Sequence, residues 1–286
     1  MKLLRVGPPG AERPVVLGQD GTAYDLSGVT ADIDGDFLAG LTGDGAAALA
    51  GQVAAGRLPV AEIGGQRVGP PVARPGKVVG IGLNYRDHAA EAGAAIPDEP
   101  VIFLKPSSTV VGPYDEVLVP RGGEKTDYEA ELAVVIGRTA RYLPDHAAAA
   151  GVIAGYTIAN DVTERAFQFE RGGQWDKGKS AETFTPLGPW LVTADEVADP
   201  QRLPLRLWVN GELRQDGSTE RMVFPVLELV RYASQFMVLE PGDVIVTGTP
   251  AGVTLGRPGT PYLAPGDIVE IEIDGLGRQR QVLGKA

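Results

Sequence analysis

The sequence of 286 residues predicts a mainly β fold with some α (α+β), a mixed β-roll or sandwich with a small N-terminal α+β domain. From Lys77 onward, strand-like runs outnumber helical segments, and the few helices do not alternate regularly with the strands. This pattern disfavours a doubly wound parallel sheet. The 39 glycines and 23 prolines indicate many turns between short strands.

The chain divides at a proline cluster, GPPVARPGK, which is typical of a linker. Before it, residues 1–70 form the small N-terminal domain, with strands at 2–6 and 14–18 and an Ala-rich helix around 45–58. Residues 71–286 form the larger domain. Its expected strands are 77–82, 101–104, 116–120, 131–137, 151–160, 189–193, 203–211, 243–248 and 267–274, and its expected helices are 84–93, 145–151, 163–171 and 225–236.

Composition excludes several classes of function. The net charge of -11 and the absence of a basic, aromatic stripe make nucleic acid an unlikely partner. Without cysteine there is no disulfide, iron-sulfur cluster, thiolate zinc site or Cys nucleophile, and two histidines are too few for a three-His zinc site. A metal here must be held mainly by oxygen, which points to Mg²⁺, Mn²⁺ or Ca²⁺. With no signal peptide or membrane-length apolar run, we expect a cytoplasmic protein with no membrane partner.

Two glutamates in the stretch TDYEAELAVVIG, Glu129 and Glu131, are the first candidates for such a site. In a strand, side chains two residues apart share a face and lie roughly 7 Å apart. Glu270 and Glu272 have the same spacing, but strict alternation with apolar residues predicts a half-exposed strand there. The run after Glu131 is apolar on both faces, so its carboxylates would enter a buried strand and need a countercharge.

Asp161 follows the strand expected at 151–160 and precedes a helix. On its own, it is more simply interpreted as a helix N-cap. In combination with Glu129 and Glu131, it is a candidate third oxygen ligand.

Three further side chains have chemistry that such a site would use. His88 and Glu91 are neighbours on one expected helix face, which suits a general base, although a surface pair is the simpler interpretation of the spacing. His146 lacks an obvious partner and is expected at the surface. Lys105, and either Lys177 or Lys179 in an expected loop, could stabilise an oxyanion near a metal.

Two glycine motifs are assigned no ligand. GIGLNY has Tyr85 where a dinucleotide fingerprint needs a third small residue, and GTPAGV lacks the lysine of a phosphate loop. The second is interpreted as a tight turn at a strand end.

Six stretches in order resemble the fumarylacetoacetate hydrolase family: GLNYRDHAAE, FLKPS, DYEAELAVVIG, ANDVTERAFQ, KGKS and VIVTGTPAGV. The resemblance runs from about Lys77 to Val282. It implies a β-rich roll, a Mg²⁺ or Mn²⁺ cofactor, a homodimer, and action on the carbon-carbon bonds of diketo acids. The N-terminal 70 residues and the stretch around KGKS are similar to the branch that hydrolyses diketo-deoxy sugar acids.

Carried over by motif, the resemblance implies a role for each candidate. The metal ligands would be Glu129, Glu131 and Asp161; the base pair would be His88 with Glu91 on a mobile helix; and the catalytic lysine would be Lys179. The implied substrate contacts are Tyr85, Lys105, Gln168 and Thr249. The family's fullest metal set has a further upstream Asp that is not assigned here, so that water or substrate oxygen would complete the shell.

The expected reaction is hydrolysis of a 2,4-diketo acid, an acylpyruvate or a diketo-deoxy sugar acid, to pyruvate and a second carboxylic acid. His88, polarised by Glu91, would take a proton from water; hydroxide would attack C4; and Lys179 would stabilise the departing enolate. Two alternatives remain open. One is a decarboxylase or isomerase of the oxaloacetate or 2-hydroxyhepta-2,4-diene-1,7-dioate type, and the other is a non-catalytic protein that binds a divalent cation.

Overall fold

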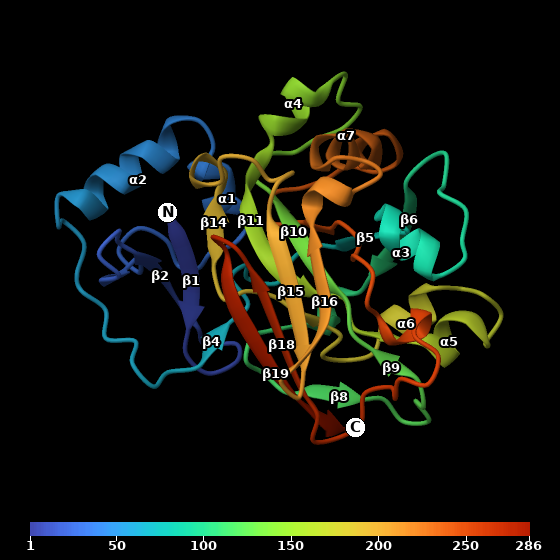
Figure 1. Cartoon of the computed structure of the whole chain (residues 1–286). Helices are drawn as coiled ribbons and strands as arrows, with labels where there is room; N and C mark the ends of the chain where they lie inside the picture. The colour runs from blue at the N-terminus through green and yellow to red at the C-terminus, as the bar shows by residue number, and fades with distance from the viewer.

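A large mixed sheet forms the centre of the molecule, which is described over residues 1–286 by a computed structural model (Figure 1). Every neighbouring pair in this sheet is antiparallel except β17 and β5, which are parallel. In spatial order, its strands are β3 (Ala23–Asp25), β2 (Arg13–Leu17), β1 (Lys2–Val6), β14 (Leu191–Thr193), β11 (Ile153–Asn160), β10 (Ala130–Ile136), β17 (Val244–Val246), β5 (Val78–Gly82) and β6 (Val101–Lys105), and β4 (Val68–Gly69) pairs with β1.

A second, five-stranded sheet packs beside the first. Its order is β16 (Glu212–Ser218), β15 (Pro204–Val209), β18 (Ile268–Ile273), β19 (Gly277–Lys285) and β8 (Val117–Val119). Two short pairs complete the strands, β12 (Thr163–Glu164) with β9 (Thr126–Asp127) and β13 (Thr185–Pro186) with β7 (Val110–Val111). The mainly β architecture with some helices confirms the predicted fold class.

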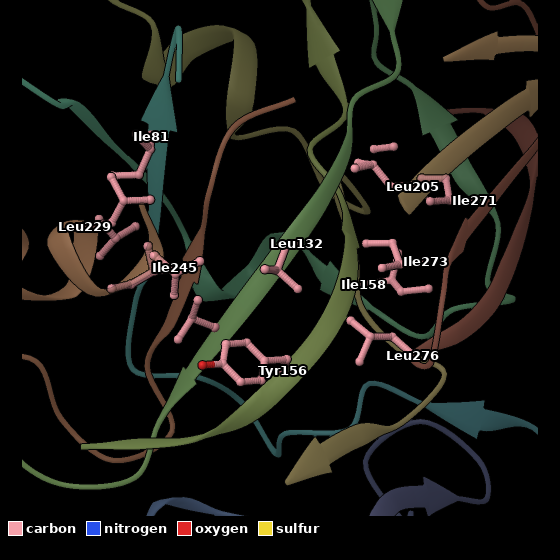
Figure 2. Packing of buried hydrophobic residues seen from close by; sticks show 14 of the residues in the cluster. Ile81, Leu132, Tyr156, Ile158, Leu205, Leu229, Ile245, Ile271, Ile273 and Leu276 are labelled. Atoms are coloured by element: carbon pink, nitrogen blue, oxygen red, sulfur yellow. The ribbon is translucent and has the colours of Figure 1, made fainter. Parts of the chain in front are cut away.

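One apolar core joins the two sheets. Ile158 of the large sheet lies against Ile273 of the small one, and Leu205 lies beside Ile271 (Figure 2). On another side of the same cluster, Leu229 from α7 (Val226–Phe236) packs near β5 and β17. The side chains of β10 are buried on both faces, as the unbroken apolar run predicts.

The remaining helices lie around the sheets. They are α1 (Gly35–Leu41), α2 (Asp44–Ala54), α3 (Arg86–Glu91), α4 (His146–Ala150), α5 (Arg165–Phe169) and α6 (Asp176–Lys179), with 3₁₀ turns at Ser107–Thr109, Ala194–Glu196, Thr219–Arg221 and Thr254–Gly256. All expected strands and helices are present, most of them with shifted ends. The expectation of a loop around Lys177 and Lys179 is wrong, because α6 forms there with Asp176 in its first turn. None of the helices combines the length and the apolar character that a membrane span needs.

Residues 1–70 do not make a separate sheet. Lys2 and Leu3 of β1 pair with Val192 and Leu191 of β14, so that β1 to β4 extend the large sheet. The guanidinium of Arg67 also binds Asp115, with Nη2 2.5 Å from Oδ2. The domain division at residue 70 stays a prediction from composition.

Candidate active site

Three carboxylates meet where β10 and β11 lie side by side. Glu129 directly precedes β10, Glu131 lies within it, and Asp161 directly follows β11. The backbone N–H of Asp161 donates to the carbonyl of Glu129 at 2.9 Å, which fixes the two chain segments together. One oxygen from each carboxylate lies within 4.8 Å of the others, and all three residues are buried. The structure therefore brings together the three predicted metal ligands.

The alternative role of Asp161 as a helix N-cap does not hold. The chain first pairs β12 with β9, and α5 begins only at Arg165. Its N-cap is Glu164, whose side chain accepts from the backbone N–H of Ala166 at 3.2 Å. The Asp161 carboxylate instead points into the cluster.

Three buried cations surround these acids. Lys179 Nζ donates to Glu129 Oε2 at 2.7 Å and to Asp161 Oδ2 at 2.6 Å, and Lys105 Nζ donates to the other oxygen of Asp161. Arg165 Nη2 donates to Glu129 Oε1 at 2.7 Å and its Nε to Asp127 Oδ2 at 2.9 Å. Counting Asp127, four buried carboxylates face three buried cations.

Glu131 is the carboxyl group with no cationic partner of its own. Burial, together with the charges of Asp161 and Glu129, raises its pKa well above the ordinary value. At Glu129, burial favours the neutral acid, but Lys179 and Arg165 outweigh it and lower the pKa to about 2. The cluster offers only carboxylate oxygens, and its four acids have one cation too few to balance their charge. Such a site fits a hard divalent cation such as Mg²⁺ or Mn²⁺.

His88 and Glu91 lie on α3 at the edge of this cluster. His88 is 7% exposed, so it is not the surface histidine that spacing alone favoured. Its Nδ1 lies 3.8 Å from Glu91 Oε2 and has no hydrogen-bond partner. Burial raises the pKa of Glu91, but hydrogen bonding and the charge of His88 lower it below the ordinary value. An anionic Glu91 can therefore stabilise the charged imidazole.

The GTPAGV turn contributes backbone donors, which its interpretation as a plain turn missed. The N–H of Gly248 donates to Glu131 Oε2 at 2.7 Å, and the N–H of Gly252 donates to Glu91 Oε2 at 2.8 Å. Both glycines have positive φ, at +92° and +115°. One turn thus orients a predicted metal ligand and the acid beside the predicted base.

A pocket of about 300 Å³ opens onto these groups. Among the predicted substrate contacts, Gln168 and Thr249 line it, whereas Tyr85 and Lys105 do not. Tyr85 is fully buried, and its hydroxyl has no hydrogen-bond partner. Lys105 is also buried and donates a hydrogen bond to Asp161. The lining residues are Ile81, Gly82, Leu83, His88, Ala92, Ala94, Phe103, Glu129, Glu131, Arg165, Gln168, Phe169, Trp175, Lys179, Gly248, Thr249 and Leu255.

Two charged residues of the site were not predicted. Asp127 precedes Glu129 by two residues, so the same spacing argument that joined the glutamates could have included it. Arg165 gave no local signal, because its contacts with Asp127 and Glu129 span 38 and 36 residues.

Away from the site, His146 does have a partner, Glu228 Oε2 at 3.0 Å, and both lie toward the surface. Glu270 and Glu272 alternate with buried residues along β18, as predicted.

Comparison with known proteins gives concordant results. Residues 77–283 match the family described as fumarylacetoacetate (FAA) hydrolase C-terminal. A protein of Burkholderia ambifaria, named as a candidate hydrolase, is 51% identical over 282 residues, covering 98% of each chain.

Two solved structures extend the likeness over the whole chain. A 2-hydroxyhepta-2,4-diene-1,7-dioate isomerase from Mycobacterium marinum has a TM-score of 0.75 at 32% identity, covering 100% of this chain and 98% of the other. Maleylpyruvate hydrolase from Sphingobium sp. SYK-6, in complex with manganese(II) and pyruvate, has a TM-score of 0.80 at 30% identity, covering 100% of both chains. The chain therefore belongs to the fumarylacetoacetate hydrolase family.

Proposed function

We propose that the protein hydrolyses the C3–C4 bond of a 2,4-diketo acid in a metal-dependent reaction, giving pyruvate and a second carboxylic acid. One observation carries the proposal: the carboxylate cluster and the buried His88–Glu91 pair line or adjoin the same pocket of about 300 Å³. The similar maleylpyruvate hydrolase, solved with manganese and pyruvate, supports this choice of chemistry.

The metal would be held by Glu129, Glu131 and Asp161, and when bound it would polarise the oxygens of the pyruvoyl end of the substrate. His88 has its Nδ1 turned toward Glu91, which leaves Nε2 to take a proton from water. Glu91, held by the Gly252 N–H, stabilises the resulting imidazolium. The hydroxide adds to C4, the C3–C4 bond breaks, and the electron pair stays on the pyruvate fragment until C3 takes up a proton.

In this proposal, Lys179 and Arg165 would stabilise the negative charge of that fragment. Both line the pocket, and both are fixed by hydrogen bonds to Glu129. Because their positions are set before substrate binds, little reorganisation is needed as the enolate charge develops.

An isomerase or decarboxylase is the second candidate. The similar isomerase from Mycobacterium marinum is the observation that favours it, since such chemistry needs no attacking water. A buried His88 next to Glu91 supports hydrolysis instead. A structural cation site is less favoured, because Ca²⁺ takes six to eight oxygen ligands, whereas this cluster has three carboxylates and two of them, Glu129 and Glu131, line a pocket.

The test is a screen of acylpyruvates, diketo-deoxy sugar acids and oxaloacetate with Mg²⁺ or Mn²⁺, with products identified by mass. We expect pyruvate plus a carboxylic acid, and no turnover with excess chelator. Carbon dioxide release, or a product of unchanged mass, would assign the second candidate. No turnover of any acid, despite tight cation binding, would favour the non-catalytic protein.

The homodimer stays a proposal from the family resemblance, and the cytoplasmic location stays a proposal from the sequence pattern. For the dimer, light scattering on the eluting protein should give twice the chain mass of 30.0 kDa.

A further inference from the structure

The pocket has two chemically different parts. Its polar part, called the floor here, consists of Glu129, Glu131, His88, Arg165, Gln168, Lys179 and Thr249. The rest of its wall is apolar, built from aromatic side chains and from leucine, isoleucine and alanine. The two parts meet where Lys179 Nζ lies 4.9 Å from the ring centroid of Phe103.

Aromatic rings form a contiguous part of the apolar wall. The rings of Phe103 and Trp175 have centroids 6.1 Å apart, and Phe169 meets Trp175 edge-on at the same distance. The indole also rests on Gly82, where an added Cβ would lie 2.4 Å from it. Trp175 therefore packs against Phe103, Phe169 and Gly82 and links the aromatic part of the wall to β5.

No cation that lines the pocket is free to bind a second carboxylate of a substrate. The two that line it, Arg165 and Lys179, are paired with buried acids, and the proposed reaction already assigns both of them to the pyruvate end of the substrate. Two further cations, Lys177 and Arg257, do not line the pocket; Lys177 donates to the carbonyl of Arg171, and Arg257 faces Glu91 at 3.7 Å.

We propose that the apolar wall binds the substrate tail beyond C4, and that this tail is an uncharged alkyl or aryl group rather than a carboxylate or a polyhydroxy chain. The inference rests on the proposed function. A tail carboxylate would lose its water without gaining a cation, and sugar hydroxyls would find few partners on this wall. Trp175, Phe169 and Leu255 would determine specificity.

A pair of substrates that differ only at the tail tests this directly. Butanoylpyruvate ends in a methyl group where succinylpyruvate has a carboxylate. We expect kcat/KM to favour butanoylpyruvate by at least about tenfold, and to favour it over a diketo-deoxy sugar acid as well. Equal values, or a preference for either polar tail, would overturn the inference while leaving C–C hydrolysis intact.

Binding of non-cleavable analogues separates this inference from the proposed reaction. 2-Oxohexanoate and 2-oxoadipate differ in the same way and lack the C4 carbonyl. Calorimetry in the presence of Mn²⁺ should show tighter binding of 2-oxohexanoate. If no diketo acid is cleaved, the proposed function fails, yet the ratio of the two dissociation constants still decides the nature of the tail site.

A change at the wall should redirect specificity. Leu255 is 37% exposed, and Leu255→Arg would place a cation at the apolar wall. We expect its preference to shift toward succinylpyruvate by at least about tenfold. The control is Leu213→Arg on β16, because this leucine is 45% exposed and does not line the pocket. An equal shift in both variants would indicate a general charge effect and would contradict the role of Leu255.

Discussion

Asp127 accepts a hydrogen bond from Arg165, with Oδ2 2.9 Å from Nε, and both side chains are buried. The same carboxylate accepts hydrogen bonds from the backbone N–H groups of Thr254 at 2.9 Å and of Leu255 at 3.1 Å. Asp127 therefore ties the guanidinium in the pocket floor to the turn that carries Leu255 into the wall. It acts through these residues, as a positioning residue.

Asp127→Asn should weaken both connections. The substitution keeps one acceptor but removes the charge opposite buried Arg165, so we expect a loss of about 3 kcal/mol in the free energy of unfolding. kcat/KM should fall at least about tenfold as Arg165 and Leu255 shift. Urea unfolding and steady-state kinetics measure the two effects. The control is Asp216→Asn, because this side chain is 65% exposed. Equal losses of stability and of kcat/KM in the two variants would contradict the positioning role of Asp127.

Glu91→Gln should lower turnover. Glutamine can still accept from Gly252, but it cannot stabilise a charged His88, so we expect kcat to fall by about two orders of magnitude with a much smaller change in KM. The matched control is Glu228→Gln, which removes the acid beside His146 at the other histidine–glutamate contact of the chain. Unchanged kcat in Glu91→Gln would exclude the pair from the reaction.

Glu131→Gln should weaken cation binding. It removes one of three clustered carboxylates, and we expect Mn²⁺ affinity, measured by calorimetry, to drop by more than about 100-fold. Glu272→Gln is matched in chemistry and in strand spacing but lies on half-exposed β18. Comparable Mn²⁺ affinity in the two variants would show that the cation binds elsewhere.

Glu12 should make a pH-dependent contribution to stability. Burial raises its pKa, but the Arg67 hydrogen bond at 2.8 Å and the charge of Arg5 outweigh burial and lower it below the ordinary value. A carboxyl with a lower pKa in the folded state stabilises the fold above its unfolded pKa of about 4.3 and loses that effect as pH falls through the folded value. Glu12→Gln should cost about 1 kcal/mol at pH 7 and progressively less below about pH 4. A difference that grows on acidification would contradict this sign.

The sequence was sufficient for the apolar strands and for the three carboxylates. Glu129 and Glu131 follow from strand periodicity, and Asp161 joins them because β10 and β11 are antiparallel neighbours, with Glu131 opposite Ala159. His88 and Glu91 also follow from helical spacing. In each case the decisive geometry is local or lies between adjacent strands.

Long-range contacts and buried polar groups could not be predicted from the sequence. No pattern in the sequence indicates that Lys105 meets Asp161, 56 residues away, or that Tyr85 turns from the pocket into the interior. Strand β19 was missed because its inward positions include Gln279 and Gln281. These amides are satisfied by each other at 2.9 Å and by backbone carbonyls, so polar residues occupy places where periodicity expects apolar ones.

The most direct test of the central claim is cleavage of an acylpyruvate in ¹⁸O-labelled water, with products identified by mass spectrometry. With acetylpyruvate and Mg²⁺, we expect pyruvate and acetate in equal amounts, with solvent oxygen in the acetate carboxylate. Excess chelator should abolish the reaction, and so should His88→Ala, while this variant keeps near-normal Mg²⁺ affinity. Cleavage that persists in His88→Ala, or a reaction that releases carbon dioxide or leaves the substrate mass unchanged, would contradict the proposed hydrolysis.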